Sequence, residues 1–194
     1  MNLNTHLFEG QLVYLAAINP ELDAQLESGW TLDGDYQRML GTDLVRPLSP
    51  AQLEKQYTEI EKEMDEKGNQ FYFTIRHLPL PVVKEPGQLL GFARLDWIEW
   101  SHGVCSLSLG IGDPAERNKG FGTDALRLLL RYAFRELNLF RISAAVPAYN
   151  QAALRLFGKE AFKEEARRRD VFHRAGKRWD GIHLGILREE WEQS

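Results

Sequence analysis

The chain has 194 residues, 43% of them hydrophobic and 27% charged, with a formal net charge of −4. This composition is typical of a globular domain with one sizeable core. No apolar run is long enough for a bilayer, and the N-terminus lacks a basic segment followed by an apolar one, so we expect a cytoplasmic protein with no membrane partner. The acidic balance argues against nucleic-acid binding. The single cysteine, Cys105, excludes an intramolecular disulfide and suits a small core residue.

The first half of the chain predicts helices followed by antiparallel strands. A capping box at Ser49, Pro50 and Gln52 indicates the start of a charged helix that runs to Lys67. The other elements expected here are a strand at Leu12–Leu15, a helix from Asn19 to about Trp30, a polar connection from Thr31 to Pro47, strands at Phe71–Ile75, Leu89–Ile98 and Val104–Ile111, and a proline-rich loop from His77 to Gly87.

The second half alternates helices and strands. Thr123–Asn138 is amphipathic, with its leucines on one stripe. The elements expected after it are a strand at Phe140–Val146, a helix at Asn150–Lys159, and strands at about Lys163–Phe172 and Gly181–Leu187. This order predicts an α/β fold, with a parallel crossover in a mixed, mostly antiparallel sheet and helices on both faces. An exposed final strand would offer an edge to a second subunit, so a homodimer stays open.

A glycine loop between a strand and a helix is the most informative segment. It reads Arg117-Asn118-Lys119-Gly120-Phe121-Gly122-Thr123. A helix N-terminus has unpaired N–H groups and a partial positive charge, and glycines let an anion approach them closely. The spacing fits neither a Walker loop nor a dinucleotide fingerprint. A phosphate site and a simple glycine turn both remain open from this segment alone.

Three segments in order resemble the GNAT superfamily of N-acetyltransferases. Arg117–Gly122 resembles its pyrophosphate motif, which lies between the fourth strand and a long helix. Asn150–Phe157 with Ala161-Phe162 resembles the family's Asn-x-x-Ala helix and the Gly-Phe step after it. The ending, Trp179–Leu187 with Glu190-Trp191, resembles the branch that acetylates ribosomal-protein N-termini. The resemblance spans about residues 12–191 and implies a single N-acetyltransferase domain over 1–194.

The resemblance implies acetyl-CoA as cosubstrate, without a metal, in a cleft where the fourth and fifth strands splay apart. Strand backbone would pair with the pantetheine arm, loop amides would hold the pyrophosphate, and Asn150 would contact pantetheine, cap its helix, or do both. The cofactor-binding residues expected on this basis are Leu109, Gly110, Ile111, Arg117, Asn118, Lys119, Gly120, Phe121, Gly122, Thr123 and Asn150.

The implied reaction is direct attack of an amine on the thioester in a ternary complex. The backbone N–H of Leu109 would polarise the carbonyl. Many members have a glutamate base on the fourth strand and a tyrosine acid seven residues after the asparagine. Here the strand offers Ser106 and Ser108, and Phe157 takes the tyrosine position. The catalytic residues expected are therefore Leu109, Tyr149 as acid and Glu99 as base through water, with Asp96 as the other carboxylate near the strand end.

The acceptor is expected to be a primary amine, on either a protein N-terminus or a small molecule. Aromatic and histidine side chains are candidates for its pocket wall, although simple packing explains them equally well; they are Trp30, Tyr36, Trp97, Trp100 and His102. Because the usual acid and base are missing, a non-catalytic acyl-CoA-binding sensor is the alternative function.

Overall fold

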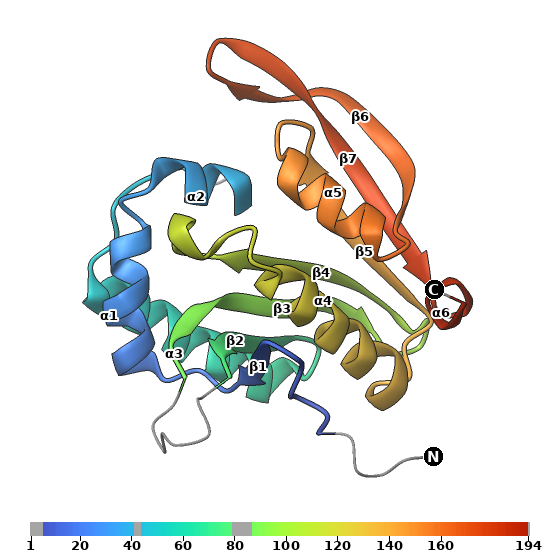
Figure 1. Ribbon diagram of the computed structural model, residues 1–194, viewed down its shortest axis with the longest axis horizontal. Coiled ribbons are helices and arrows are strands. Elements are labelled where there is room, and N and C mark those ends of the chain that lie inside the picture. The colour runs from blue at the N-terminus through green and yellow to red at the C-terminus, as the bar shows by residue number, and fades with distance from the viewer. Residues whose placement is uncertain (1–5, 41–43, 79–86, 194) are drawn as a thin grey trace.

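A computed structural model describes residues 6–40, 44–78 and 87–193, and shows an α/β fold around one twisted sheet (Figure 1). The strand order is β1-β2-β3-β4-β5-β7-β6. Among the described strands, β4 and β5 form the only neighbouring pair that is parallel, which confirms the predicted crossover. The strands are β1 (Val13–Ala16), β2 (Phe71–His77), β3 (Leu89–Glu99), β4 (Val104–Ile111), β5 (Arg141–Pro147), β6 (Lys163–Arg174) and β7 (Lys177–Leu187).

The helices begin where the sequence signals place them. Asn19 caps the first helix, and Ser49 and Gln52 form the predicted capping box, closed at the other end by left-handed Gly68. The helices are α1 (Pro20–Trp30), α2 (Gly34–Leu40), α3 (Pro50–Lys67), α4 (Phe121–Arg131), α5 (Gln151–Lys159) and α6 (Arg188–Glu192). A π-helical turn at Tyr132–Glu136 continues α4, and a 3₁₀ turn lies at Pro114–Glu116.

Three expectations were wrong or incomplete. The polar connection from Thr31 to Pro47 contains α2, and α6 was not predicted. The final strand is not an edge, because β7 pairs with β5 on one side and β6 on the other, so β6 is the exposed edge. Of the predicted proline-rich loop, 79–86 lie outside the described residues.

The two faces of the sheet differ in chemistry. On one face α4 and α5 cover the main core, in which the side chains of Leu95, Leu129 and Ile142 are fully buried. The opposite face, under α1 and α3, is polar along its centre, where Tyr72, Arg94 and Ser108 lie directly opposite one another on neighbouring strands. The strand period of two thus separates an apolar face from a polar one.

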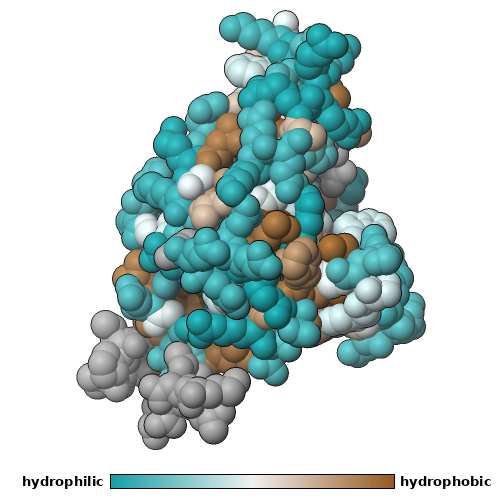
Figure 2. All heavy atoms as spheres, turned by 90° about the vertical axis from the view of Figure 1, so that its right-hand side faces the viewer, coloured by the Kyte–Doolittle hydropathy of each residue, from teal (hydrophilic) through white to brown (hydrophobic). Residues whose placement is uncertain are grey.

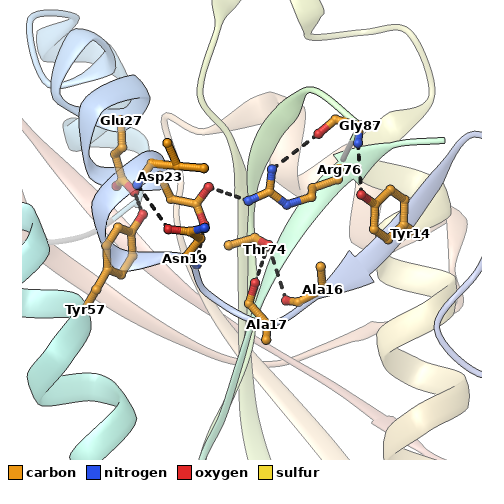
Figure 3. Close-up of polar contacts among 11 residues, drawn as sticks. Tyr14, Ala16, Ala17, Asn19, Asp23, Glu27, Tyr57, Thr74, Arg76 and Gly87 are labelled. Carbon is orange, nitrogen blue, oxygen red and sulfur yellow. Dashed lines mark hydrogen bonds and ion pairs between the residues drawn. The ribbon is translucent and has the colours of Figure 1, made fainter. Parts of the chain in front are cut away.

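A buried ion pair fixes α1 to this polar face (Figure 3). Asp23 of α1 has no exposed surface; it pairs with Arg76 of β2 and accepts the Asn19 N–H at 2.8 Å. Arg76 also donates to the Gly87 carbonyl, and the Gly87 N–H donates to the Tyr14 hydroxyl at 3.0 Å. The network therefore joins α1 to β1 and β2.

A second carboxylate ties the start of β1 to the first turn of α4. Asp124 accepts the backbone N–H groups of Gln11, Leu12 and Val13 at 2.9, 2.7 and 3.0 Å. A side chain at Gly10 would collide with this carboxylate, because a Cβ there would lie 2.4 Å from Oδ2. Asp124 therefore holds the N-terminus of α4, and with it the glycine loop, in place.

Among the described residues, no helix has both the length and the apolar character needed to cross a bilayer. The face toward the viewer in Figure 2 is covered mainly by hydrophilic side chains, with hydrophobic ones in small separate patches. No broad apolar surface is visible on that face.

Candidate active site

A cavity of about 600 Å³ opens where β4 and β5 separate. The two strands pair only from Val104 to Ser106, and beyond that they diverge. The cavity is lined by the free half of β4, the end of β5, the glycine loop, most of α5 and residues of α2. This volume is typical of a small-molecule site.

Most of the predicted site residues meet in this cavity. Those that line it are Leu109, Gly110, Ile111, Arg117, Asn118, Gly120, Gly122, Thr123, Tyr149 and Asn150. Two do not. Lys119 pairs with Glu116 on the surface, and the buried Phe121 ring packs against His77. Of these two residues, only the backbone amides can contribute to an anion site at the loop.

The free half of β4 presents peptide groups to the cavity. Antiparallel ladders alternate, so residues that bond to β3 alternate with residues that point away from it. Gly112 donates its N–H to Leu90 on the β3 side. By alternation, the peptide groups of Leu109 and Ile111 face the gap toward β5. This is the arrangement that an extended pantetheine arm requires.

The glycine loop has a local geometry suited to an anion. Asn118 and Gly120 have φ values of 64° and 93°, so left-handed residues alternate with right-handed ones. In the described part of the chain, the N–H groups of residues 120–123 have no protein acceptor. Four free amides at the N-terminus of an eleven-residue helix form a concave anion site. A pyrophosphate fits this donor set.

The Arg117 side chain stabilises the loop through hydrogen bonds and an ion pair. Its guanidinium donates to the carbonyls of Ile111 and Gly112 at 3.1 and 2.6 Å, and pairs with Asp33 at 3.0 Å. It also lies over the Tyr36 ring, 5.9 Å from the centroid. These partners connect the loop to the segment that leads into α2.

Helix α2 forms one wall of the cavity, held by residues that sequence analysis assigned to chemistry. The Tyr149 hydroxyl donates to the Arg38 carbonyl at 2.9 Å, and Asn150 Nδ2 donates to the Met39 carbonyl at 3.0 Å. Asn150 Oδ1 accepts the Ala153 N–H, which confirms its predicted role as the α5 cap. Both side chains are thus hydrogen-bonded to protein groups.

Tyr36 was expected from the sequence as a candidate for the pocket wall, but the helix α2 that carries it was missed. Tyr36, Met39 and Leu40 all line the cavity, at helical spacing that would have revealed an apolar stripe. The Tyr36 hydroxyl is buried without a partner among the described residues, and burial raises its pKa well above the usual value. Tyr36 therefore stays protonated at neutral pH.

The positions at which an acid and a base were expected lie in different parts of the fold. Phe157 is buried against Phe162, so the cavity wall has no hydroxyl at that position. Glu99, the expected base, is not brought to the cavity. It lies exposed at the far end of β3 opposite Val104, at the paired end of β4. Trp97, Trp100 and His102 are exposed at that same end.

Gly112 offers a test of the packing beside the cavity. A Cβ there would lie 2.0 Å from the Trp30 ring, so Gly112→Ala is expected to lower the free energy of unfolding by about 1–3 kcal/mol. Gly29→Ala is the matched control, because nothing lies within 4 Å of its Cβ in α1. It should stabilise by up to about 1 kcal/mol. Denaturant unfolding checks both, and equal effects would contradict the packing.

Comparison with known proteins identifies the family. The acetyltransferase (GNAT) domain family matches residues 13–163. The chain is a GNAT acetyltransferase. It is an N-acetyltransferase that depends on acetyl-CoA, as the motif resemblance implied.

Three similar proteins illustrate the range within this GNAT family. The SPbeta prophage-derived N-acetyltransferase YokL of Bacillus subtilis (strain 168) is 27% identical over 183 residues, covering 94% of each chain. The putative ribosomal N-acetyltransferase YdaF of the same organism is 29% identical, covering 55% of this chain and 57% of its own. The Vibrio cholerae spermidine N-acetyltransferase, solved with CoA and spermine, has a TM-score of 0.75 at 20% identity and covers 93% and 98%.

Proposed function

We propose that this enzyme acetylates a small primary amine that is an ammonium ion in solution. The observation that carries the proposal is the position of the cavity, with free loop amides at one end and the polar sheet face beside it. Helix α1, over that face, has no basic residue, and besides Asp23, which is paired with Arg76, it carries the carboxylates of Glu21 and Glu27. Carboxylates attract ammonium groups. The structural neighbour that binds spermine is consistent with such an acceptor.

In this proposal the cosubstrate lies along β4. The backbone groups of Leu109 and Ile111 that face the gap bind the pantetheine arm, while Gly110 between them pairs with Phe92 of β3. The Leu109 N–H polarises the thioester carbonyl. The backbone amides of residues 118–123 bind the pyrophosphate. The side chains of Lys119 and Phe121 take no part in this binding. Arg117 orders the loop, while Tyr149 and Asn150 hold α2 against the cavity.

A ribosomal-protein N-terminus is the second candidate acceptor. The similarity of the chain ending to that branch and the partial match to YdaF favour it. A peptide acceptor needs an open route across the mouth of the cavity. Here Leu40 of α2 packs closely over Gly110, because a Cβ added at Gly110 would lie 2.5 Å from the Leu40 side chain. This packing favours a small acceptor.

Release of free CoA thiol from acetyl-CoA distinguishes these acceptors. The panel contains spermidine, spermine, simple alkylamines and N-terminal peptides of ribosomal proteins, each with an acceptor-free control. We expect thiol release with the small amines. Release with the peptides alone would replace the proposal by N-terminal acetylation, and release with no member would overturn it.

A further inference from the structure

Asp96 is a largely buried carboxylate at the apex of the β4–β5 separation. It lies opposite Ser106 of β4, and Ser106 lies opposite Ser143 of β5 in the last parallel pair before the strands diverge. Opposed side chains project from the same face of a sheet with Cβ atoms about 5 Å apart. The Asp96 side chain is 18% exposed, so water can still reach it.

One guanidinium connects Asp96 to the cavity wall. Arg94 Nε donates to Ser108 Oγ at 2.8 Å and lies 2.9 Å from Asp96 Oδ2. Ser108 lines the cavity. One ion pair and one hydrogen bond therefore connect the carboxylate to the surface that faces the ligands.

The backbone of β3 is distorted immediately after Asp96. The register shifts between Asp96 and Glu99, and Trp97 has a φ of 55°. Burial of the indole does not explain this conformation, because Trp97 is 78% exposed. Bulges beside active sites commonly re-aim a side chain. Here the bulge shifts the register of β3 against β4 directly after Asp96, before pairing resumes between Glu99 and Val104.

We propose that Asp96 is the general base of the reaction, acting through a water molecule above Ser106. It supplies from β3 a carboxylate that β4, with Ser106 and Ser108 at these positions, does not offer. The proposal rests on the proposed amine acetylation and adds the residue that makes the amine nucleophilic.

The protons balance as follows. The acceptor ammonium gives one proton to the water, which passes a proton to Asp96 and from there to solvent. The neutral nitrogen then forms a bond to the acetyl carbon, and the carbon–sulfur bond breaks. The second proton of the nitrogen ends on the departing thiolate, so the products are the acetamide, the free thiol and one released proton.

The surroundings of Asp96 suit a base. Burial raises the pKa of its carboxyl above the ordinary value, and Arg94 on the same strand only partly opposes this. Across the strand pairs, Cys105 and Ser106 of β4 are its neighbours, and the Asp96 charge contributes to the raised pKa of the Cys105 thiol. A base with a raised pKa accepts protons more readily near neutral pH.

The pH dependence of kcat/KM for Asp96→Asn tests the role. With the best acceptor of the panel, the wild type should show an acidic limb at a pH above the ordinary aspartate range. Asp96→Asn should lose this limb and about a hundredfold in kcat at neutral pH. Its rate should recover as rising pH deprotonates the free amine, and its acetyl-CoA affinity should not change.

Further variants keep the test decisive. Asp96→Glu should retain the limb and most of the rate, even if the asparagine variant folds poorly. Asp65→Asn is the matched charge control, since Asp65 is exposed on α3. Unchanged pH profiles in Asp96→Asn, or loss of the limb in Glu99→Gln instead, would overturn the proposal. A wild type without acceptor-dependent thiol release would overturn the proposed function itself.

Discussion

Gly120→Glu should weaken acetyl-CoA binding about a hundredfold, equivalent to roughly 2.7 kcal/mol. Gly120 caps α4 at a φ of 93° and lines the cavity beside the free amides. The new carboxylate would repel the pyrophosphate and fill the space that the anion needs. Titration calorimetry with acetyl-CoA measures the loss directly.

The left-handed backbone of Gly120 makes a matched control necessary, because any side chain there is strained. Gly176, in the β6–β7 turn, has a φ of 73° and open space around its Cβ. Gly176→Glu introduces the same charge and comparable strain away from the cavity, and should leave the affinity unchanged. If folded Gly120→Glu bound acetyl-CoA as tightly as the wild type, the loop would not be part of the acetyl-CoA site.

Arg76→Met should lower the free energy of unfolding by about 3–5 kcal/mol. The change leaves the carboxylate of Asp23 without its cation in a site with no exposed surface (Figure 3). It also removes the donor to the Gly87 carbonyl. Denaturant unfolding with a constant m-value measures the loss.

A double-mutant cycle separates the pair from its surroundings. Asp23→Leu combined with Arg76→Met removes both charges and should recover part of the loss. Arg141→Met, which breaks the pair with Glu165 where each side chain is about a third exposed, should cost no more than about 1 kcal/mol. A loss in Arg76→Met as small as in this control would show that the buried pair does not hold α1.

Local signals predicted most of the fold correctly, because each depends on neighbouring residues. The Ser49 capping box, the Gly68 stop and the amphipathic stripe of α4 all lie where expected. Alternation of strand and helix after β4 predicted the parallel pair. The place of β7 between β5 and β6 was not predictable in this way, since long-range pairing decides it.

The position of the glycine loop at the cavity was predictable from the sequence, whereas the relative positions of the carboxylates on β3 were not. The loop motif places its own residues next to the cavity through local backbone geometry. Asp96 and Glu99 lie on the same strand near its end, and the sequence gives no means to choose between them. Register with β4 and the bulge at Trp97 decide that Asp96 lies at the apex and Glu99 at the far end.

The stoichiometry of acetyl transfer to a small amine tests most directly whether this enzyme acetylates such an acceptor. Purified enzyme is incubated with acetyl-CoA and spermidine, and mass spectrometry quantifies the acetylated amine while a thiol reagent quantifies free CoA. We expect both products to form in equal amounts, and only when enzyme and amine are present. Tight acetyl-CoA binding with no acetylated spermidine, spermine or alkylamine would contradict the proposed function.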